Sequence, residues 1–149
     1  MNTLGLFDAI DISSSALTAQ KTRIDIISKN IANANTTRAT GGMPYRRQMV
    51  VFRENKEDSF AHYLNRYSSL FRGKGVEIEE IVEDESPYKL KYEPGHPDAD
   101  ENGYVMMPNV DVVVEMVDLI DAQRAYEANI TAINTTKSMM LSALDIGRR

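Results

Sequence analysis

The sequence predicts an α+β protein in which two long terminal helices form an antiparallel coiled-coil hairpin, with a small β-rich module inserted between them. Near both ends of the chain, apolar residues recur at alternating steps of three and four, which is the repeat of helices that pack as coiled coils. Between these regions the pattern changes to alternation in steps of two, which is typical of strands. We therefore expect residues 1–36 and 108–149 to form a coiled-coil core and residues 37–107 to form the β-rich module.

The amino-terminal helix is predicted from a single apolar seam. Its apolar members are Leu6, Ile10, Leu17, Ile24, Ile27, Ile31 and Ala34, and Ser13 and Gln20 occupy two further positions of the same repeat. We expect the helix to end near residues 33–35, because asparagine tolerates the left-handed conformation that closes helices. Gly41, Gly42 and Pro44 follow and interrupt any helical pattern.

The carboxy-terminal helix is predicted from a longer seam of the same kind. Its apolar and aromatic members are Val112, Met116, Leu119, Tyr126, Ile130, Ile133, Met140 and Leu144, with Ile120 beside them. Pro108 precedes this helix, and Asn109 or Asp111 can cap the free amide groups of its first turn. Gly147 is a reasonable stop for the helix.

Four short strands are predicted between the helices, over residues 47–52, 76–82, 88–92 and 104–107. Turn-forming residues separate them, and Asn102 with Gly103 supplies the positive backbone angles of a tight turn. Residues 59–71 are ambiguous, because their apolar side chains share one helical face while tyrosine and phenylalanine also suit strands. Of the two, we expect a helix there.

Composition excludes several functions. Seventeen basic and twenty-two acidic residues give a net charge of -5, which opposes binding to nucleic acid. The chain has no cysteine, so disulfides, thiolate metal sites and thiol catalysis are excluded. Asp8 and Asp11 interrupt the apolar run that a cleavable signal peptide needs, and no stretch reaches the ~20 apolar residues of a membrane-spanning helix. We expect no membrane insertion.

The acidic turn near residue 100 is the best candidate for a metal site. Its match to the opening of an EF-hand loop consists of Asp98, Asp100, Asn102 and Gly103. The twelfth position of the loop, however, is Asn109 instead of the required glutamate. His96 lies in the same turn, but the only other histidine, His62, is in a different segment. We therefore expect no bound metal, no cofactor and no enzymatic activity.

Surplus apolar residues predict that the chain assembles with other molecules. Val113, Ile120 and Leu141 lie beside the carboxy-terminal seam, and Ile12 and Ile26 lie off the amino-terminal one. A two-stranded hairpin would leave much of this surface in water, so packing against neighbours is the economical way to bury it. A head-to-tail contact between copies would produce a filament or helical tube.

Three stretches of the chain carry a family likeness. They are the asparagine-rich segment 28–37, residues 41–52, and a long stretch over residues 83–88 and 94–111 that continues into the last helix. The motif residues in these stretches are Asn30, Asn33, Asn35, Thr36, Gly103, Tyr104, Pro108, Asn109, Arg124, Tyr126 and Asn129. Together the stretches resemble the rod proteins of the bacterial flagellar basal body, and within that family the proximal rod type.

The resemblance implies a structural subunit of the flagellar rod that assembles through its terminal helices and transmits torque. The implied partners are other proximal and distal rod proteins and copies of the same chain. The resemblance also implies export by the flagellar type III apparatus without a cleavable signal peptide, into a rod that crosses the periplasm. The alternative, from another class, is a cytoplasmic coiled-coil adaptor or export chaperone that binds one partner.

Overall fold

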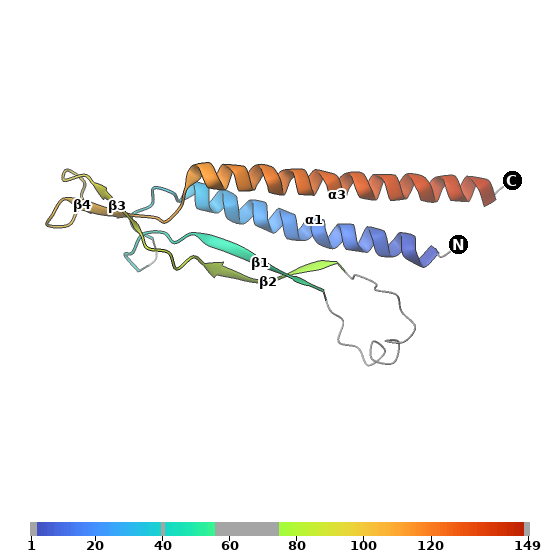
Figure 1. Ribbon diagram of the computed structural model, residues 1–149, viewed down its shortest axis with the longest axis horizontal. Coiled ribbons are helices and arrows are strands. Elements are labelled where there is room, and N and C mark those ends of the chain that lie inside the picture. The colour runs from blue at the N-terminus through green and yellow to red at the C-terminus, as the bar shows by residue number, and fades with distance from the viewer. Residues whose placement is uncertain (1–2, 40, 56–74, 148–149) are drawn as a thin grey trace, which may run out of the picture. The chain divides into compact units, whose positions relative to one another are not determined.

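The computed structural model describes residues 3–39, 41–55 and 75–147 of the chain, and Figure 1 shows its elements. In chain order they are α1 (Thr3–Ala32), β1 (Gln48–Glu54), β2 (Val76–Glu83), β3 (Lys89–Tyr92), β4 (Tyr104–Met107) and α3 (Val112–Gly147). The predicted α+β class is confirmed, because a long helix at each end brackets the four strands in the sequence. The helix expected over residues 59–71 lies outside the described residues.

The chain divides into two compact units. The first consists of Met1–Lys21, Phe52–Glu79 and Gln123–Arg149, and the second of Thr22–Val51 and Glu80–Ala122. Both helices and the first two strands contribute residues to each unit.

Helix α1 ends where the asparagine-rich segment begins. The helix stops at Ala32, and a turn over residues 33–35 follows it. The Lys29 carbonyl oxygen accepts two hydrogen bonds from Asn33, one from its backbone amide at 3.1 Å and one from its side chain at 2.9 Å. The helix ends close to the predicted position, but neither Asn33 nor Asn35 has the left-handed conformation on which that prediction was based.

Helix α3 begins directly after a capping aspartate. Asp111 Oδ1 accepts hydrogen bonds from the backbone amides of Val113 at 3.0 Å and Val114 at 3.4 Å. These two bonds and the nearby ammonium group of Lys89 hold the pKa of the Asp111 carboxyl below its usual value. Of the two caps considered from the sequence, Asp111 makes these bonds.

The strands form two separate two-stranded sheets. One pairs β1 with β2, and the other pairs β3 with β4. β3 and β4 are antiparallel, with Lys89 opposite Met107 and Tyr92 opposite Tyr104, and they lie side by side in Figure 1. Gly103 in the connection between them has a φ of 80°, whereas Asn102 does not have the positive φ that the turn prediction gave to both residues.

In the first unit, the start of β2 lies against α1 at Gly75. The Ser15 hydroxyl accepts a hydrogen bond from the Val76 amide at 3.1 Å. A Cβ atom at position 75 would lie 2.1 Å from Ser15 Oγ, and the φ of +91° disfavours any side chain there. Glycine at this position is what allows the strand to approach the helix.

In the second unit, a small apolar cluster covers the end of α1. Ala34, Tyr45 and Val110 are buried, and Ala39 and Val112 pack against them.

Within the described residues, no helix has an apolar stretch long enough to cross a bilayer.

Candidate assembly interface

Helix α3 carries two heptad repeats on different faces. The first, which we call the buried seam, contains buried and half-buried residues at alternating steps of three and four: Val112, Glu115, Leu119, Ala122, Tyr126, Asn129, Ile133, Thr136 and Met140. The second, which we call the exposed stripe, has the same spacing one residue further along the helix. Its apolar members are all exposed: Val113, Met116, Ile120, Ile130, Leu141 and Leu144.

The seam predicted for α3 from the sequence therefore divides between these two faces. Five of its residues lie half-buried in the buried seam: Val112, Leu119, Tyr126, Ile133 and Met140. Met116, Ile120, Ile130 and Leu144 lie instead on the exposed stripe, with exposures from 39% for Ile130 to 70% for Leu144. Their role in contacts between molecules stays a prediction.

The predicted seam of α1 is less exposed. Ile27 is buried, while Ile10, Leu17, Ile24 and Ile31 are half-buried, and the side chain of Leu6 is outside the described ones. Gln20, which interrupts this seam, has its Oε1 atom buried with no hydrogen-bond partner among the described residues. Phe7, at the beginning of α1, is 61% exposed.

A buried asparagine ties α1 to β1 and α3 in the second unit. Asn30 is 1% exposed. Its Nδ2 atom donates to the Gln48 carbonyl oxygen at 2.8 Å and to Glu115 Oε2 at 3.0 Å. Its Oδ1 atom accepts from the Tyr45 hydroxyl at 2.8 Å and the Gln48 amide at 3.0 Å. One side chain thereby bonds to four polar groups from three other residues.

The Tyr45 hydroxyl must keep its proton in order to donate its hydrogen bond to Asn30 Oδ1. Burial raises the pKa of the Tyr45 hydroxyl above its usual value, and the nearby carboxylates of Glu115 and Glu83 add to the rise. The hydroxyl is therefore a donor to Asn30 throughout the physiological pH range.

Glu115 is the charged centre of the same region. It is fully buried, and its Oε1 atom accepts from Arg47 Nε at 2.6 Å. The Arg47 guanidinium also lies 3.6 Å from Asp84 and 3.5 Å from Asp118, so three carboxylates surround one cation. Asp118 pairs in addition with Arg23 of α1 at 3.3 Å. These contacts run antiparallel, since Arg23 meets Asp118 while the later residue Asn30 meets the earlier residue Glu115.

Asn109 joins the segment before α3 to the same region. Its Oδ1 atom accepts from the Arg47 amide at 2.9 Å, and its Nδ2 atom donates to the carbonyl oxygens of Asp84 and Ser86. Hydrogen bonds from Ser86 and the nearby Arg47 lower the pKa of the Asp84 carboxyl. Pro108, next to Asn109, is fully buried. We call the group Asn30, Tyr45, Arg47, Asn109 and Glu115 the polar clasp.

The remaining motif residues either contact one nearby residue or are exposed. Thr36 donates to Asn33 Oδ1 at 3.2 Å, and Asn129 donates to the Ala125 carbonyl oxygen at 2.8 Å. Tyr104 contacts the Tyr92 ring edge-on, at 5.3 Å between ring centroids. Asn35 and Arg124 are exposed.

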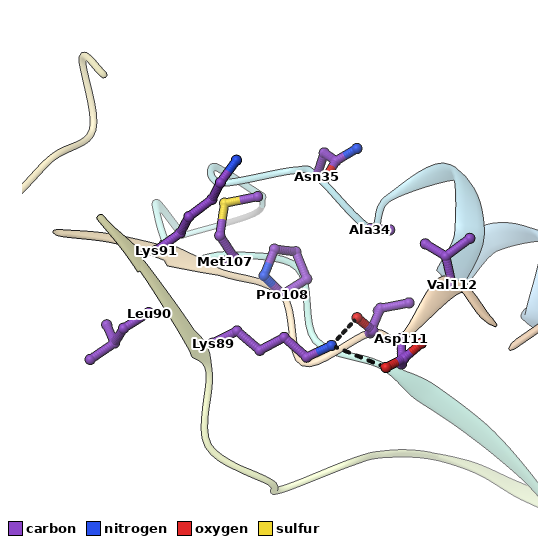
Figure 2. A pocket seen from close by; sticks show the side chains of 10 residues that line it. Ala34, Asn35, Lys89, Leu90, Lys91, Met107, Pro108, Asp111 and Val112 are labelled. Carbon is purple, nitrogen blue, oxygen red and sulfur yellow. Dashed lines mark hydrogen bonds and ion pairs between the residues drawn. The ribbon is translucent and has the colours of Figure 1, made fainter. Parts of the chain in front are cut away.

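An open pocket of about 420 Å³ lies between β3 and the segment that enters α3 (Figure 2). Lys89, Lys91, Met107 and Pro108 contribute to its lining. Figure 2 shows Lys89 reaching across it to Asp111, 3.7 Å away, and its ammonium group also donates to the Val110 carbonyl oxygen at 2.8 Å. The polar groups in this pocket thus bind each other and hold the segment in place.

The acidic turn considered as a metal site uses its carboxylates within the chain. Asp98 accepts from the Thr37 hydroxyl at 2.7 Å and pairs with Arg38, and these contacts lower the pKa of its carboxyl. Asp100 Oδ1 accepts from the amides of Asn102 at 2.9 Å and Tyr104 at 2.8 Å. The two aspartates hold the turn in its observed conformation.

Comparison with known proteins agrees with the likeness read from the sequence. A family model described as flagella basal body rod protein matches residues 10–40. A second, described as flagellar basal body rod FlgEFG protein C-terminal, matches residues 101–146. The two matches cover most of α1, including Asn30, and most of α3, together with the preceding segment that carries Asn109.

Relatives match over nearly the whole chain. The flagellar basal-body rod protein FlgC of Borreliella burgdorferi is 49% identical over 149 residues, covering 96% of this chain and 98% of the relative. The protein of the same name from Bacillus subtilis is 48% identical over 148 residues, covering 95% and 98%. That of Escherichia coli O6:H1 is 43% identical over 145 residues, covering 97% and 100%. The chain therefore belongs to the FlgC family of flagellar basal-body rod proteins, which makes it a structural subunit of the rod and not an enzyme.

Proposed function

We propose that this subunit assembles into the proximal rod by burying the exposed stripe of α3 and the exposed apolar side chains of α1 against neighbouring subunits. The observation that supports this most strongly is the exposure of the six apolar side chains of the stripe, whose other positions are Gln123, Glu127, Asn134 and Lys137. Apolar side chains recur along it from Val113, which is 71% exposed, to Leu144, which is 70% exposed. Burying a half-exposed side chain of this size contributes about 1 kcal/mol, so the stripe provides a substantial driving force for association.

The architecture of the assembled subunit follows from the same surfaces. We propose that residues 1–36 and 108–149 form a coiled-coil hairpin in the core of the rod and that residues 37–107 lie outside it. The antiparallel contacts of Arg23 with Asp118 and of Asn30 with Glu115 support this arrangement within the second unit. Torque then passes from subunit to subunit through packed helices, with no chemical step.

The neighbours in this proposal are copies of the same chain and other proximal and distal rod proteins. Assembly outside the cytoplasm requires export, and we propose the flagellar type III apparatus as the route, with no cleaved signal peptide. The site of assembly is the basal-body rod where it crosses the periplasm. The family membership of the chain supports all three statements.

Fractionation of cells tests this function against the alternative of a cytoplasmic adaptor or export chaperone. Membranes and basal bodies of the source bacterium are purified and probed with an antibody against this chain. We expect the chain to remain with intact basal bodies after detergent extraction, at its full length by mass spectrometry. Recovery solely as a small soluble complex with one partner would contradict the proposal and favour the adaptor.

A further inference from the structure

The beginning of α3 has its acidic side chains inward and its apolar side chains outward. Residues 112–120, which we call the inverted segment, consist of seven apolar residues and two acidic ones, Glu115 and Asp118. Glu115 is fully buried and Asp118 is half-buried. Five of the apolar side chains have exposures between 49% and 71%: Val113, Val114, Met116, Val117 and Ile120. This pattern is the reverse of an ordinary surface helix, whose apolar side faces the core.

The rest of α3 does not share this reversal. From residue 123 onward, four exposed positions of the exposed stripe are polar or charged, namely Gln123, Glu127, Asn134 and Lys137. Such side chains favour water, so their own chemistry explains why they face outward. The inverted segment is therefore the part of the helix that hydrophobicity alone would turn the other way.

The polar clasp contacts α3 within the inverted segment. Glu115 accepts hydrogen bonds from Arg47 Nε at 2.6 Å and from Asn30 Nδ2 at 3.0 Å. Asp118, on the same side of the helix, lies 3.5 Å from Arg47 and 3.3 Å from Arg23. Both carboxylates thus find cations from other segments on the inner side of the helix. A buried carboxylate is stable only with such partners, so these contacts explain why the acidic side faces inward.

Hydrogen bonds to a buried carboxylate are suited to fixing the rotation of this helix. Apolar attraction has no preferred direction, so a helix start that is apolar on nearly every side can pack in several rotations. The bonds of Glu115 require one geometry, and a wrong rotation separates the carboxylate from its cation. Single buried polar residues fix the register of coiled coils for the same reason.

We propose that Glu115 is a positioning residue, whose contacts with Arg47 and Asn30 hold the inverted segment with its apolar side outward. Without these contacts, the segment turns its carboxylates to water and buries Met116 and Ile120 in their place. The rotation is about 100°, which is the angle between neighbouring residues on a helix. This inference concerns the single chain. Its consequence, that the polar clasp keeps the beginning of the exposed stripe available to neighbouring subunits, rests on the proposed function.

Thiol labelling of the purified, monomeric chain tests the inference, since the sequence has no natural cysteine. Met116→Cys reports on the outer side of the helix, where Met116 is 51% exposed, and Ala122→Cys on the inner side, where Ala122 is fully buried. With Arg47 present, we expect iodoacetamide to react about tenfold faster at position 116 than at position 122. With Arg47→Met, the reaction at position 116 should slow by about fivefold and the reaction at position 122 should become about fivefold faster.

A loss of stability alone would give a different result. Local unfolding speeds labelling at both positions, whereas rotation slows it at position 116 and speeds it at position 122. Arg46→Met is the matched control, because Arg46 donates to the Asp84 carbonyl oxygen at 3.1 Å and lies over the Tyr88 ring, outside the polar clasp. This change should leave both rates within about twofold of those with Arg46 present.

A second substitution should restore the observed rotation. In the chain that combines Arg47→Met with Glu115→Leu, the inward residue is apolar and needs no cation, so labelling at position 116 should return to within about twofold of its original rate. Arg47→Gln covers the case in which Arg47→Met does not fold. It removes the charge but keeps a hydrogen-bond donor, and both rates should shift in the same directions by about twofold.

Each other outcome overturns a defined statement. Unchanged or faster labelling at position 116 in the Arg47 variants would overturn the positioning role of Glu115, as would no recovery in the double variant. Failure of both Arg47 variants to fold would also overturn it, because the inference requires a second stable rotation.

Basal bodies of the source bacterium give a separate readout for assembly. Arg47→Met should lower incorporation of the chain by about tenfold, and addition of Glu115→Leu should restore it. Reversed labelling of the purified chain together with normal incorporation would overturn assembly through this face of α3 and leave the positioning role of Glu115 standing.

Discussion

Replacing Asn30 with alanine is expected to lower the free energy of unfolding by about 3 to 5 kcal/mol, because the change leaves several buried polar groups without partners. Asn30 is 1% exposed and bonds to both backbone groups of Gln48, to the Tyr45 hydroxyl and to Glu115. In the variant, these groups lose hydrogen bonds that water cannot easily replace. Urea titration followed by circular dichroism measures the effect as a lower transition midpoint.

Two further variants calibrate this result. Tyr45→Phe removes one hydroxyl from the polar clasp and should cost only about 1 kcal/mol. Asn35→Ala is the matched control, because Asn35 is exposed, belongs to the same asparagine-rich segment and makes no side-chain hydrogen bond within the described residues. It should change stability by less than about 0.5 kcal/mol. Equal stability of the Asn30→Ala variant and the unmodified protein would show that the polar clasp does not hold the helices and strand together.

Replacing Ile120 with aspartate is expected to remove the chain from assembled rods while leaving the free monomer folded. Ile120 is 49% exposed in the single chain, so a carboxylate there is solvated and should alter stability by no more than about 0.5 kcal/mol. In an apolar contact between subunits, the same charge costs about 3 kcal/mol or more, which corresponds to at least about a hundredfold weaker association. Immunoblots of purified basal bodies measure incorporation, and circular dichroism of the purified monomer checks the fold.

Ala128→Asp is the matched control for this variant. Ala128 is exposed on the same helix but lies on neither the buried seam nor the exposed stripe, so the same charge there should leave incorporation nearly unchanged. Normal levels of the Ile120→Asp variant in rods would mean that water still reaches this part of the stripe after assembly. That result would remove the main support for the proposed interface.

Local patterns were sufficient to predict the elements of the fold. The change of period from 3.6 to 2 located both helices and all four strands to within a few residues, because each pattern records which side chains the element buries. The residues at the helix ends and in the turns were equally informative. The asparagines after Ala32, the capping Asp111 and Gly103 act through their own backbone and nearest neighbours, so their roles can be read without knowing the tertiary structure.

The orientation of α3 could not be predicted in the same way. The predicted seam joined Leu119 and Tyr126, which are half-buried, to Met116 and Ile130, which are exposed. The reason is that every second position of the buried seam is a polar or small residue, namely Glu115, Ala122, Asn129 or Thr136. A search for large apolar residues does not include these positions. Two heptad repeats one residue apart on one helix cannot be separated by hydrophobicity when the buried one contains polar residues.

The polar clasp was missed for a related reason. A glutamate with no exposed surface is rarely expected in a core, so the sequence does not single out Glu115. Its burial depends on Arg47 and Asn30, which are distant in sequence and come together only in the folded chain. The family likeness singled out Asn30 and Asn109 as motif residues, but their hydrogen-bond partners could be identified only from the structure.

Hydroxyl-radical footprinting of the methionines tests the central claim most directly, because it compares the same surface in the free chain and in the rod. Met116 lies on the exposed stripe and is 51% exposed, while Met43, in the segment between α1 and β1, is 57% exposed and serves as the reference. In the free monomer we expect the two to oxidise at similar rates. In purified basal bodies, Met116 should be protected by about tenfold relative to Met43, since a side chain buried between subunits is closed to solvent. Equal oxidation of Met116 in the free chain and in the rod would contradict assembly through this face of α3.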